Sequence, residues 1–229
     1  MITIKETNFP DKNFRDWLLK QDYGKDGVLT EKAINSITLI DVNYQDISTL
    51  KGIEHFTALT TLLCSGNQLT TLDLSNNKAL MQATCCFNQL TTLNISNCTK
   101  LTWLDCSNNH LTNLDVSGHK TLATLICSAN QLTTIDVSEC LMLISLRCNL
   151  NQIKEAAMDK LIDGLPQKER GWFFVCGNTN SAEGNVCTKA QAAAAKAKGW
   201  TTYRSIFSTA VALYADSDDI QPNLPKRKQ

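Results

Sequence analysis

A unit of 21 residues repeats along this chain, and that period restricts the possible folds more than any other feature. The unit begins at Leu59 and recurs every 21 residues until its last copy begins at Leu143. A looser unit of 22 residues, 37–58, precedes it. Fixed periods of this length are the signature of solenoids, in which each unit packs only against its neighbours. We therefore predict six stacked units over residues 37–163.

Each regular unit follows the pattern L-x-x-L-x-L-x-x-N-x-L, with cysteine in place of the third leucine. The alternation in the L-x-L segment predicts a short strand with one face turned inward, and stacking pairs these strands into a parallel sheet. The pattern is that of leucine-rich repeats. It predicts an α/β solenoid with a parallel β-sheet. The fourth position of each unit should point into the core: Leu62, Ala83, Leu104, Leu125 and Leu146.

Ten cysteines are present, and half of them occupy the sixth position of the regular units. We call this set the cysteine ladder: Cys64, Cys85, Cys106, Cys127 and Cys148. Thiols on adjacent parallel strands, roughly 4.8 Å apart, do not readily adopt the disulfide dihedral angle. We expect free, buried thiols that act as small hydrophobic side chains. Metal binding and redox sensing are the functional alternatives, and packing is favoured because no histidine or carboxylate recurs beside the ladder.

Two further columns of the repeat have structural interpretations. The ninth position forms what we call the asparagine ladder: Asn67, Asn88, Asn109, Asn130 and Asn151. An amide can both donate to and accept from the backbone groups that a sharp turn leaves inside the solenoid. Asp73, Asn94, Asp115 and Asp136 should face water. Cys98 and Cys140 share the nineteenth position two units apart, which is too far for a disulfide.

Residues 1–36 predict a helical cap over the first repeat. Phe9, Phe14, Trp17 and Leu18 suit an amphipathic helix that starts near Pro10. The segment that follows resembles an EF-hand loop in outline, with Asp22, Asp26 and Gly27 at its first, fifth and sixth positions. Gly24 and Ala33 stand where two ligands belong. A degenerate helix-loop-helix cap is therefore favoured over a calcium site.

Residues 164–214 predict a small α/β cap at the other end. A helix that stops at Gly164 leads to this cap, and an apolar strand over 172–176 follows. A second helix opens with a capping box of Thr188 and Gln191, and a closing strand comes next. This order implies parallel strands that continue the sheet. Residues 215–229 have the composition of a tail.

Cys176 and Cys187 are ten residues apart across a polar loop of this cap. If the protein is exported, they could form a disulfide, which would contribute roughly 2 to 3 kcal/mol for a loop of this size.

The balanced net charge of the chain argues against strongly charged partners such as nucleic acids. Lys plus Arg and Asp plus Glu number 22 each, so no basic excess supports binding of nucleic acid or of an acidic membrane surface. No stretch approaches the ~20 apolar residues of a membrane span, and the first residues lack a secretory apolar run. We expect either a cytosolic protein or one whose signal was removed.

No catalytic constellation emerges from the sequence. The histidines, His55, His110 and His119, all lie in the repeats, away from Cys176 and Cys187, and we expect the last two histidines to be solvated. Phosphate loops, nucleophile elbows, paired carboxylates and zinc-type cysteine pairs are missing from the sequence. We therefore expect a non-enzyme without metal or cofactor.

The outward strand positions predict a binding face. They are mostly Thr and Ser, together with a candidate ligand set of Leu63, Phe87, Trp103, Asp105, Ile126 and Arg147. Ser65, Ser107, Thr124 and Asn149 are assigned to the same face. Exposed aromatic residues near an arginine are typical of interface hot spots. We expect a monomer that binds a protein or a glycan here; in the alternative, neighbours or self-association cover these residues.

The cysteine-containing 21-residue unit resembles the repeats of internalin-J-like proteins and of Bacteroidetes leucine-rich-repeat surface proteins. The resemblance implies a secreted or surface bacterial protein that acts in adhesion to host or community macromolecules. The internalins' cell-wall sorting motif is missing from this sequence, so the resemblance does not extend to covalent anchoring. The alternatives are an intracellular scaffold, a structural repeat segment of a larger protein, and a calcium-dependent binder through Asp22 and Asp26.

Overall fold

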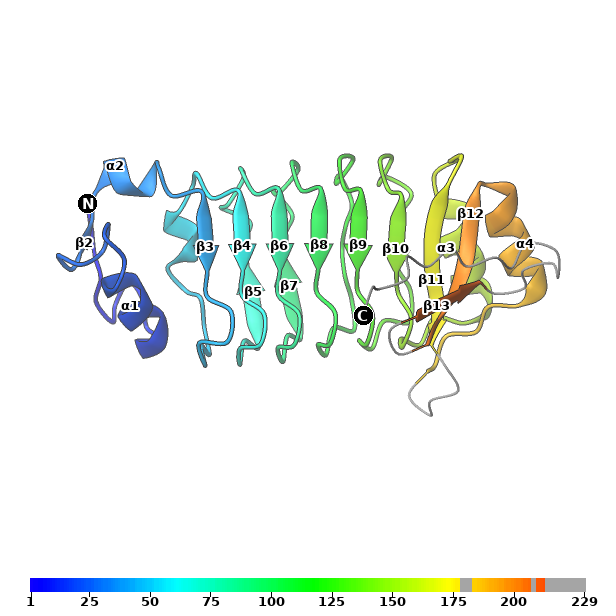
Figure 1. The fold of residues 1–229 in the computed structure, drawn as a ribbon, viewed down its shortest axis with the longest axis horizontal. Helices are drawn as coiled ribbons and strands as arrows, with labels where there is room; N and C mark the ends of the chain where they lie inside the picture. The colour runs from blue at the N-terminus through cyan, green and yellow to red at the C-terminus, as the bar shows by residue number, and fades with distance from the viewer. Residues whose placement is uncertain (178–182, 207–208, 213–229) are drawn as a thin grey trace, which may run out of the picture.

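The repeats form a row of parallel strands that runs from left to right in Figure 1 in the computed structural model, which describes residues 1–177, 183–206 and 209–212. The predicted tail, 215–229, lies outside the described residues. One nine-stranded sheet runs the length of the molecule in the order β13-β12-β11-β10-β9-β8-β6-β4-β3. The predicted parallel-sheet solenoid is confirmed.

Three-residue strands supply most of this sheet. One comes from each repeat: β3 (Leu39–Asp41), β4 (Thr61–Leu63), β6 (Gln82–Thr84), β8 (Trp103–Asp105), β9 (Thr124–Ile126) and β10 (Ser145–Arg147). All of them pair in parallel without a shift of register. On the opposite side of the coil, β5 (Thr71–Asp73) and β7 (Thr92–Asn94) form a second short parallel pair.

The core between the two sides is built from the predicted inward positions. The fourth-position residues are buried, from Leu62 to Leu146, with Ala83 the smallest among them. The cysteine ladder is fully buried and consists of free thiols, as predicted. Its small side chains fill the space where the commoner repeat carries leucine, so the ladder contributes to packing.

The asparagine ladder satisfies the backbone in the tight turn after each strand. In the third regular unit, Asn109 Oδ1 accepts a hydrogen bond from the Leu90 N–H at 2.9 Å. Its Nδ2 donates to the carbonyls of Cys85 and Cys106 at 3.1 and 3.0 Å. Each asparagine thus links its own turn to the preceding repeat, which confirms the prediction.

A second buried column lies at the nineteenth position, on the far side of the coil. We call it the mixed ladder: Asn77, Cys98, His119 and Cys140. Each member approaches the carbonyl 24 residues earlier, at distances of 2.9, 3.2, 3.1 and 3.6 Å respectively. The prediction that His119 is solvated is wrong. It is fully buried because its position in the repeat is a core position that requires a hydrogen-bond donor.

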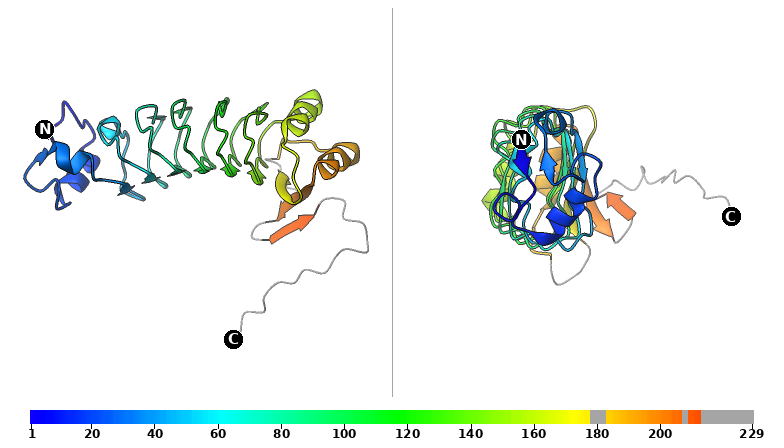
Figure 2. Two further views of the ribbon diagram at one scale, coloured as in Figure 1. Left: turned by 90° about the horizontal axis from the view of Figure 1, so that it is seen from above. Right: turned by 90° about the vertical axis from the view of Figure 1, so that its left-hand side faces the viewer.

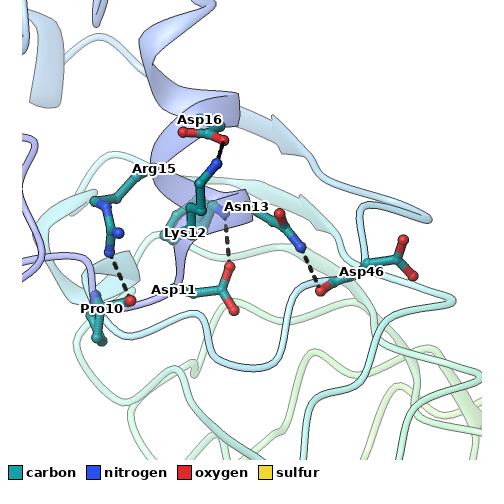
Figure 3. A network of polar contacts seen from close by, with 8 residues as sticks. Pro10, Asp11, Lys12, Asn13, Arg15, Asp16 and Asp46 are labelled. Atoms are coloured by element: carbon teal, nitrogen blue, oxygen red, sulfur yellow. Dashed lines mark hydrogen bonds and ion pairs between the residues drawn. The ribbon is translucent and has the colours of Figure 1, made fainter.

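The N-terminal cap covers the first repeat through α1 (Lys12–Leu19), α2 (Glu31–Ile34) and the antiparallel pair β1 (Ile2–Thr3) and β2 (Val28–Leu29). The Asp11 carboxylate caps α1 by accepting from the Phe14 N–H, and it also accepts from the N–H and hydroxyl of Ser48. Asn13 donates to the Asp46 carbonyl (Figure 3). These contacts join the helix to the first repeat. The repeat also contains a 3₁₀ turn, Ile53–His55.

The C-terminal cap continues the main sheet. Helix α3 (Glu155–Gly164) leads into β11 (Gly171–Gly177), and α4 (Lys189–Ala197) leads into β12 (Trp200–Ile206). Strand β11 pairs in parallel with both β10 and β12, while β13 (Thr209–Ala212) is antiparallel to β12. The predicted capping box at the start of α4 is present. Figure 2 shows α3 and α4 on one side of the row of strands, whereas β13 lies on the other side.

Candidate binding face

Two outward rows of side chains cross the main sheet. The strand register places one row from β3 to β12 as Leu39, Thr61, Gln82, Trp103, Thr124, Ser145, Trp172 and Thr201. The other row is Asp41, Leu63, Thr84, Asp105, Ile126, Arg147, Phe174 and Tyr203. Large side chains are concentrated in the second half of both rows, over β8 to β12.

Two tryptophans flank a shallow hollow in this half of the sheet. Trp103 on β8 and Trp172 on β11 are 40% and 45% exposed, and two small residues, Thr124 and Ser145, separate them along the row. The hollow has a volume of about 270 Å³. We call it the tryptophan hollow, lined by Trp103, Thr124, Ile126, Ile144, Ser145, Arg147, Trp172 and Phe174. Exposed indoles on a rigid sheet are typical of binding surfaces.

A stack of three side chains forms one side of the tryptophan hollow. The guanidinium carbon of Arg147 lies 4.5 Å from the centre of the Phe174 ring. That ring stacks on Tyr203, with 5.0 Å between ring centres and 20° between ring planes. The three residues are neighbours in one row, on β10, β11 and β12. The sheet register thus holds the guanidinium over an aromatic platform.

The structure places three of the six predicted ligand residues at the tryptophan hollow. Trp103, Ile126 and Arg147 line the tryptophan hollow. Leu63 lies further along the same face, on β4. The Asp105 carboxylate accepts from the N–H and hydroxyl of Ser107 within its own turn. The role of this predicted ligand set in binding stays a prediction.

Phe87 lies at the rim of the sheet, in the turn after β6. It is 58% exposed and has a φ of 55°, in the left-handed region. The same region is occupied at the eighth position of every unit: Tyr44, Gly66, Phe87, Asn108, Ala129 and Leu150. The turn therefore imposes this conformation, and glycine is the residue that adopts it without strain. An exposed aromatic ring here has no folding role that the structure shows.

Three residues assigned to the outward face are buried, namely Ser65, Ser107 and Asn149, whereas Thr124 keeps its outward place in the strand register with only 9% of its surface exposed. The assignment is wrong for these three, whose side-chain polar groups form hydrogen bonds within one turn or between adjacent turns. The Ser128 hydroxyl, for example, donates to Asn149 Oδ1 at 2.8 Å.

Sequence reasoning missed the part of the tryptophan hollow that comes from the C-terminal cap. Trp172, Phe174 and Tyr203 belong to β11 and β12, which were assigned only a capping role. The signal was available in the alternation along β11, where Phe173 and Val175 are buried while Trp172 is exposed. Once β11 is placed in register with β10, its outward residues extend the face.

The buried cysteines are poorly suited to redox or metal chemistry. Burial raises the pKa of Cys85, Cys106, Cys127 and Cys148 well above that of an ordinary thiol. The thiolate is the nucleophile and the metal ligand, so these groups are unreactive at neutral pH. Among the described residues, no group of three His, Cys, Asp or Glu side chains is placed to hold a metal ion.

Two smaller predictions concern the caps. Burial and the nearby Cys176 raise the pKa of Cys187 to about 12, and a disulfide between the two stays a prediction. In the EF-hand-like loop, Asp22 faces solvent and lies 4.0 Å from the Lys25 ammonium. Its calcium binding is likewise untested.

Comparisons with known proteins support the repeat type. No family model matches the chain. Internalin J of Listeria monocytogenes serotype 4b (strain F2365) is 40% identical over 70 residues, which is 30% of this chain and 8% of that protein. The solved functional domain of InlJ from Listeria monocytogenes, which includes a cysteine ladder, aligns with a TM-score of 0.66 and 33% identity. That alignment covers 82% of this chain and 39% of the InlJ chain.

A more distant structure shares the fold alone. A leucine-rich-repeat protein of Leptospira interrogans aligns with a TM-score of 0.59 and 21% identity, over 76% of this chain and 44% of that one. This chain therefore spans less than half the length of each of these relatives. None of its described helices has the length and apolar character needed to cross a membrane.

Proposed function

We propose that this chain, whose cysteine-ladder leucine-rich repeats are similar to those of internalin J, is a non-catalytic binding module that captures a protein or a glycan. The tryptophan hollow is the proposed contact surface. We further propose that the module acts outside a bacterial cell, in adhesion or in interaction with a host or community, as the family resemblance implies.

One observation carries the proposal: two half-exposed tryptophans flank a hollow on a rigid sheet. Leaving such side chains in water is unfavourable by about 25 cal/mol for each Å² of apolar surface. A ligand that covers the indoles recovers this free energy. A continuous parallel register from β8 in the repeats to β11 in the C-terminal cap fixes the backbone that carries both indoles. Little ordering of the backbone is then needed on association.

The test is capture by a panel of immobilised extracellular proteins and oligosaccharides. Trp103→Ala and Trp172→Ala should each weaken capture by tenfold or more, in the range of interface hot spots, and leave the melting temperature within about 2 °C. Tyr44→Ala is the matched control, because this aromatic side chain is 73% exposed and lies outside the hollow. Capture that survives both tryptophan substitutions, or no capture by any member of the panel, would contradict the proposal.

A further inference from the structure

The Arg147 guanidinium has no counter-ion in the described part of the molecule. The ion pairs of Lys12 with Asp16 and of Lys25 with Asp22 lie far along the chain, in the N-terminal cap. The acid closest to Arg147 in its own row is Asp105, two strands away, and its carboxylate is engaged by Ser107. Among the residues that the structure describes, none accepts a hydrogen bond from the Arg147 guanidinium.

Aromatic stacking restricts this exposed guanidinium in the absence of a ligand. Stacking on Phe174, which itself stacks on Tyr203, restricts a side chain that would otherwise be flexible. A guanidinium is planar, and its donors match the two oxygens of a carboxylate. Holding it in one place lowers the entropy cost of forming that pair.

The side chains around Arg147 indicate the chemistry of the rest of a ligand whose carboxylate pairs with this guanidinium. Apart from this guanidinium, the tryptophan hollow offers the Thr124 and Ser145 hydroxyls, two indoles, Ile126, Ile144 and Phe174. The strand backbones beneath are engaged in the sheet. A peptide lying here would bury its own N–H and C=O groups with few partners, which is unfavourable.

A sugar ring suits these walls better than a peptide does. Its C–H face can pack against an indole while its hydroxyl groups, at the edge of the ring, keep their contact with water. Trp172 lies on the strand next to Arg147, and Trp103 lies three strands from Trp172, roughly 14 Å away at 4.8 Å per strand. The hollow is therefore open along the row, as a chain of linked sugars requires.

We infer that the tryptophan hollow binds an acidic glycan, with Arg147 pairing with the carboxylate of one sugar and the tryptophans stacking on the rings. This inference rests on the proposed function and specifies the ligand class of the same surface.

The experiment compares ligands that differ only in charge. Binding of the full chain to oligogalacturonate is measured beside its methyl ester, which has the same rings without the carboxylates, and beside hyaluronan fragments and sialyllactose. At least one carboxylate glycan should bind, and esterification should weaken binding by tenfold or more. Arg147→Gln should remove the difference between acid and ester, while Arg147→Lys, which lacks the planar fork, should retain only part of it. Lys100→Gln, which removes a positive charge outside the hollow, should have no effect.

Three outcomes would overturn the inference: no binding of any carboxylate glycan, equal binding of acid and ester, or binding that Arg147→Gln leaves unchanged. Poly-glutamate that binds as well as the glycans would indicate an acidic peptide instead. If a neutral glycan or a protein binds in a Trp103-dependent way and Arg147→Gln has no effect, the inference fails while the proposed function survives.

Discussion

Two buried polar columns run through the same repeats and differ in how strictly their residue type is kept. The asparagine ladder carries asparagine in all five regular units, whereas the mixed ladder carries asparagine, cysteine, histidine and cysteine. Both are sequestered from solvent, and both bind backbone carbonyls of the preceding repeat.

The number of contacts explains the difference. The two N–H groups of the Asn109 amide are shared among three carbonyls and its oxygen accepts from the Leu90 N–H, so its position demands a donor and an acceptor on one short side chain. At the mixed ladder the repeat presents carbonyl groups alone. Any donor of suitable size, whether amide, thiol or imidazole, can meet that need. The Oδ1 atom of Asn77 has no hydrogen-bond partner among the described residues, as expected where no acceptor is required.

The largest expected effect is that of replacing asparagine by cysteine in the asparagine ladder, compared with the same replacement in the mixed ladder. Asn109→Cys should lower the free energy of unfolding by about 3 kcal/mol, because the two N–H donors and the acceptor oxygen of the amide are lost at about 1 kcal/mol each. Urea unfolding of the purified chain measures the loss, and Asn77→Cys is the matched control. Equal losses at both positions would show that the two ladders impose the same demand.

His119 tests whether the mixed ladder needs a donor or merely a filled volume. Its Nε2 lies 3.1 Å from the Ile95 carbonyl and its Nδ1 lies 2.9 Å from the Ser117 carbonyl. His119→Leu fills the space without a donor and should cost about 2 kcal/mol, while His119→Asn keeps a donor and should cost less than about 1 kcal/mol. Thermal unfolding distinguishes the two variants. If His119→Leu proved the more stable, the ladder would be a packing column.

The difference between the ladders also explains what could be predicted from the sequence. The asparagine ladder, the cysteine ladder and the parallel sheet follow directly from the 21-residue period, because each depends on residues that recur. His119 could not be placed from its type, since its neighbours in the column are chemically different. Aligning it with Cys98 and Cys140, which were already recognised as one column, would have predicted its burial.

The binding face was predicted in part for a similar reason. Trp103, Ile126 and Arg147 belong to regular units, so their outward direction follows from the pattern. Trp172, Phe174 and Tyr203 lie beyond the last unit, where the period no longer gives the register. Only the pairing of β10 with β11 and of β11 with β12 brings them beside Arg147. A β-bulge after Phe174 adds an irregularity that no repeat pattern contains.

Alkaline pH should distinguish the thiol members of the mixed ladder from the others. Burial, followed by the charges of Asp136 and Glu139, raises the pKa of Cys140 from 9.0 to about 11. The unfolded chain therefore loses this proton first. The stability that the thiol contributes is fully present below pH 9 and is lost as the pH rises towards 11. Cys140→Asn should make the decline in unfolding free energy shallower by at most about 1.4 kcal/mol per pH unit. Denaturant titrations between pH 8 and 11 measure how the unfolding free energy falls with pH in the original chain and in Cys140→Asn. Identical slopes in the two proteins would mean that Cys140 has the same pKa in the folded and unfolded states.

The smallest expected effect is that of Asn77→Cys. The amide donates to the Ile53 and Phe56 carbonyls, at 2.9 and 3.1 Å. One unit later, the Cys98 thiol contacts the two equivalent carbonyls, those of Leu74 and Asn77. A cysteine at position 77 can therefore stay in contact with both carbonyls, but its single S–H donates more weakly than the two N–H groups of the amide. The substitution also removes a buried oxygen that has no partner. These effects oppose each other, so the unfolding free energy should change by less than about 1 kcal/mol. Asn77→Ala, which removes the donor entirely, should cost more than Asn77→Cys. A cysteine variant as unstable as the alanine variant would mean that the mixed ladder selects for the amide, and the contrast with the asparagine ladder would then be one of degree.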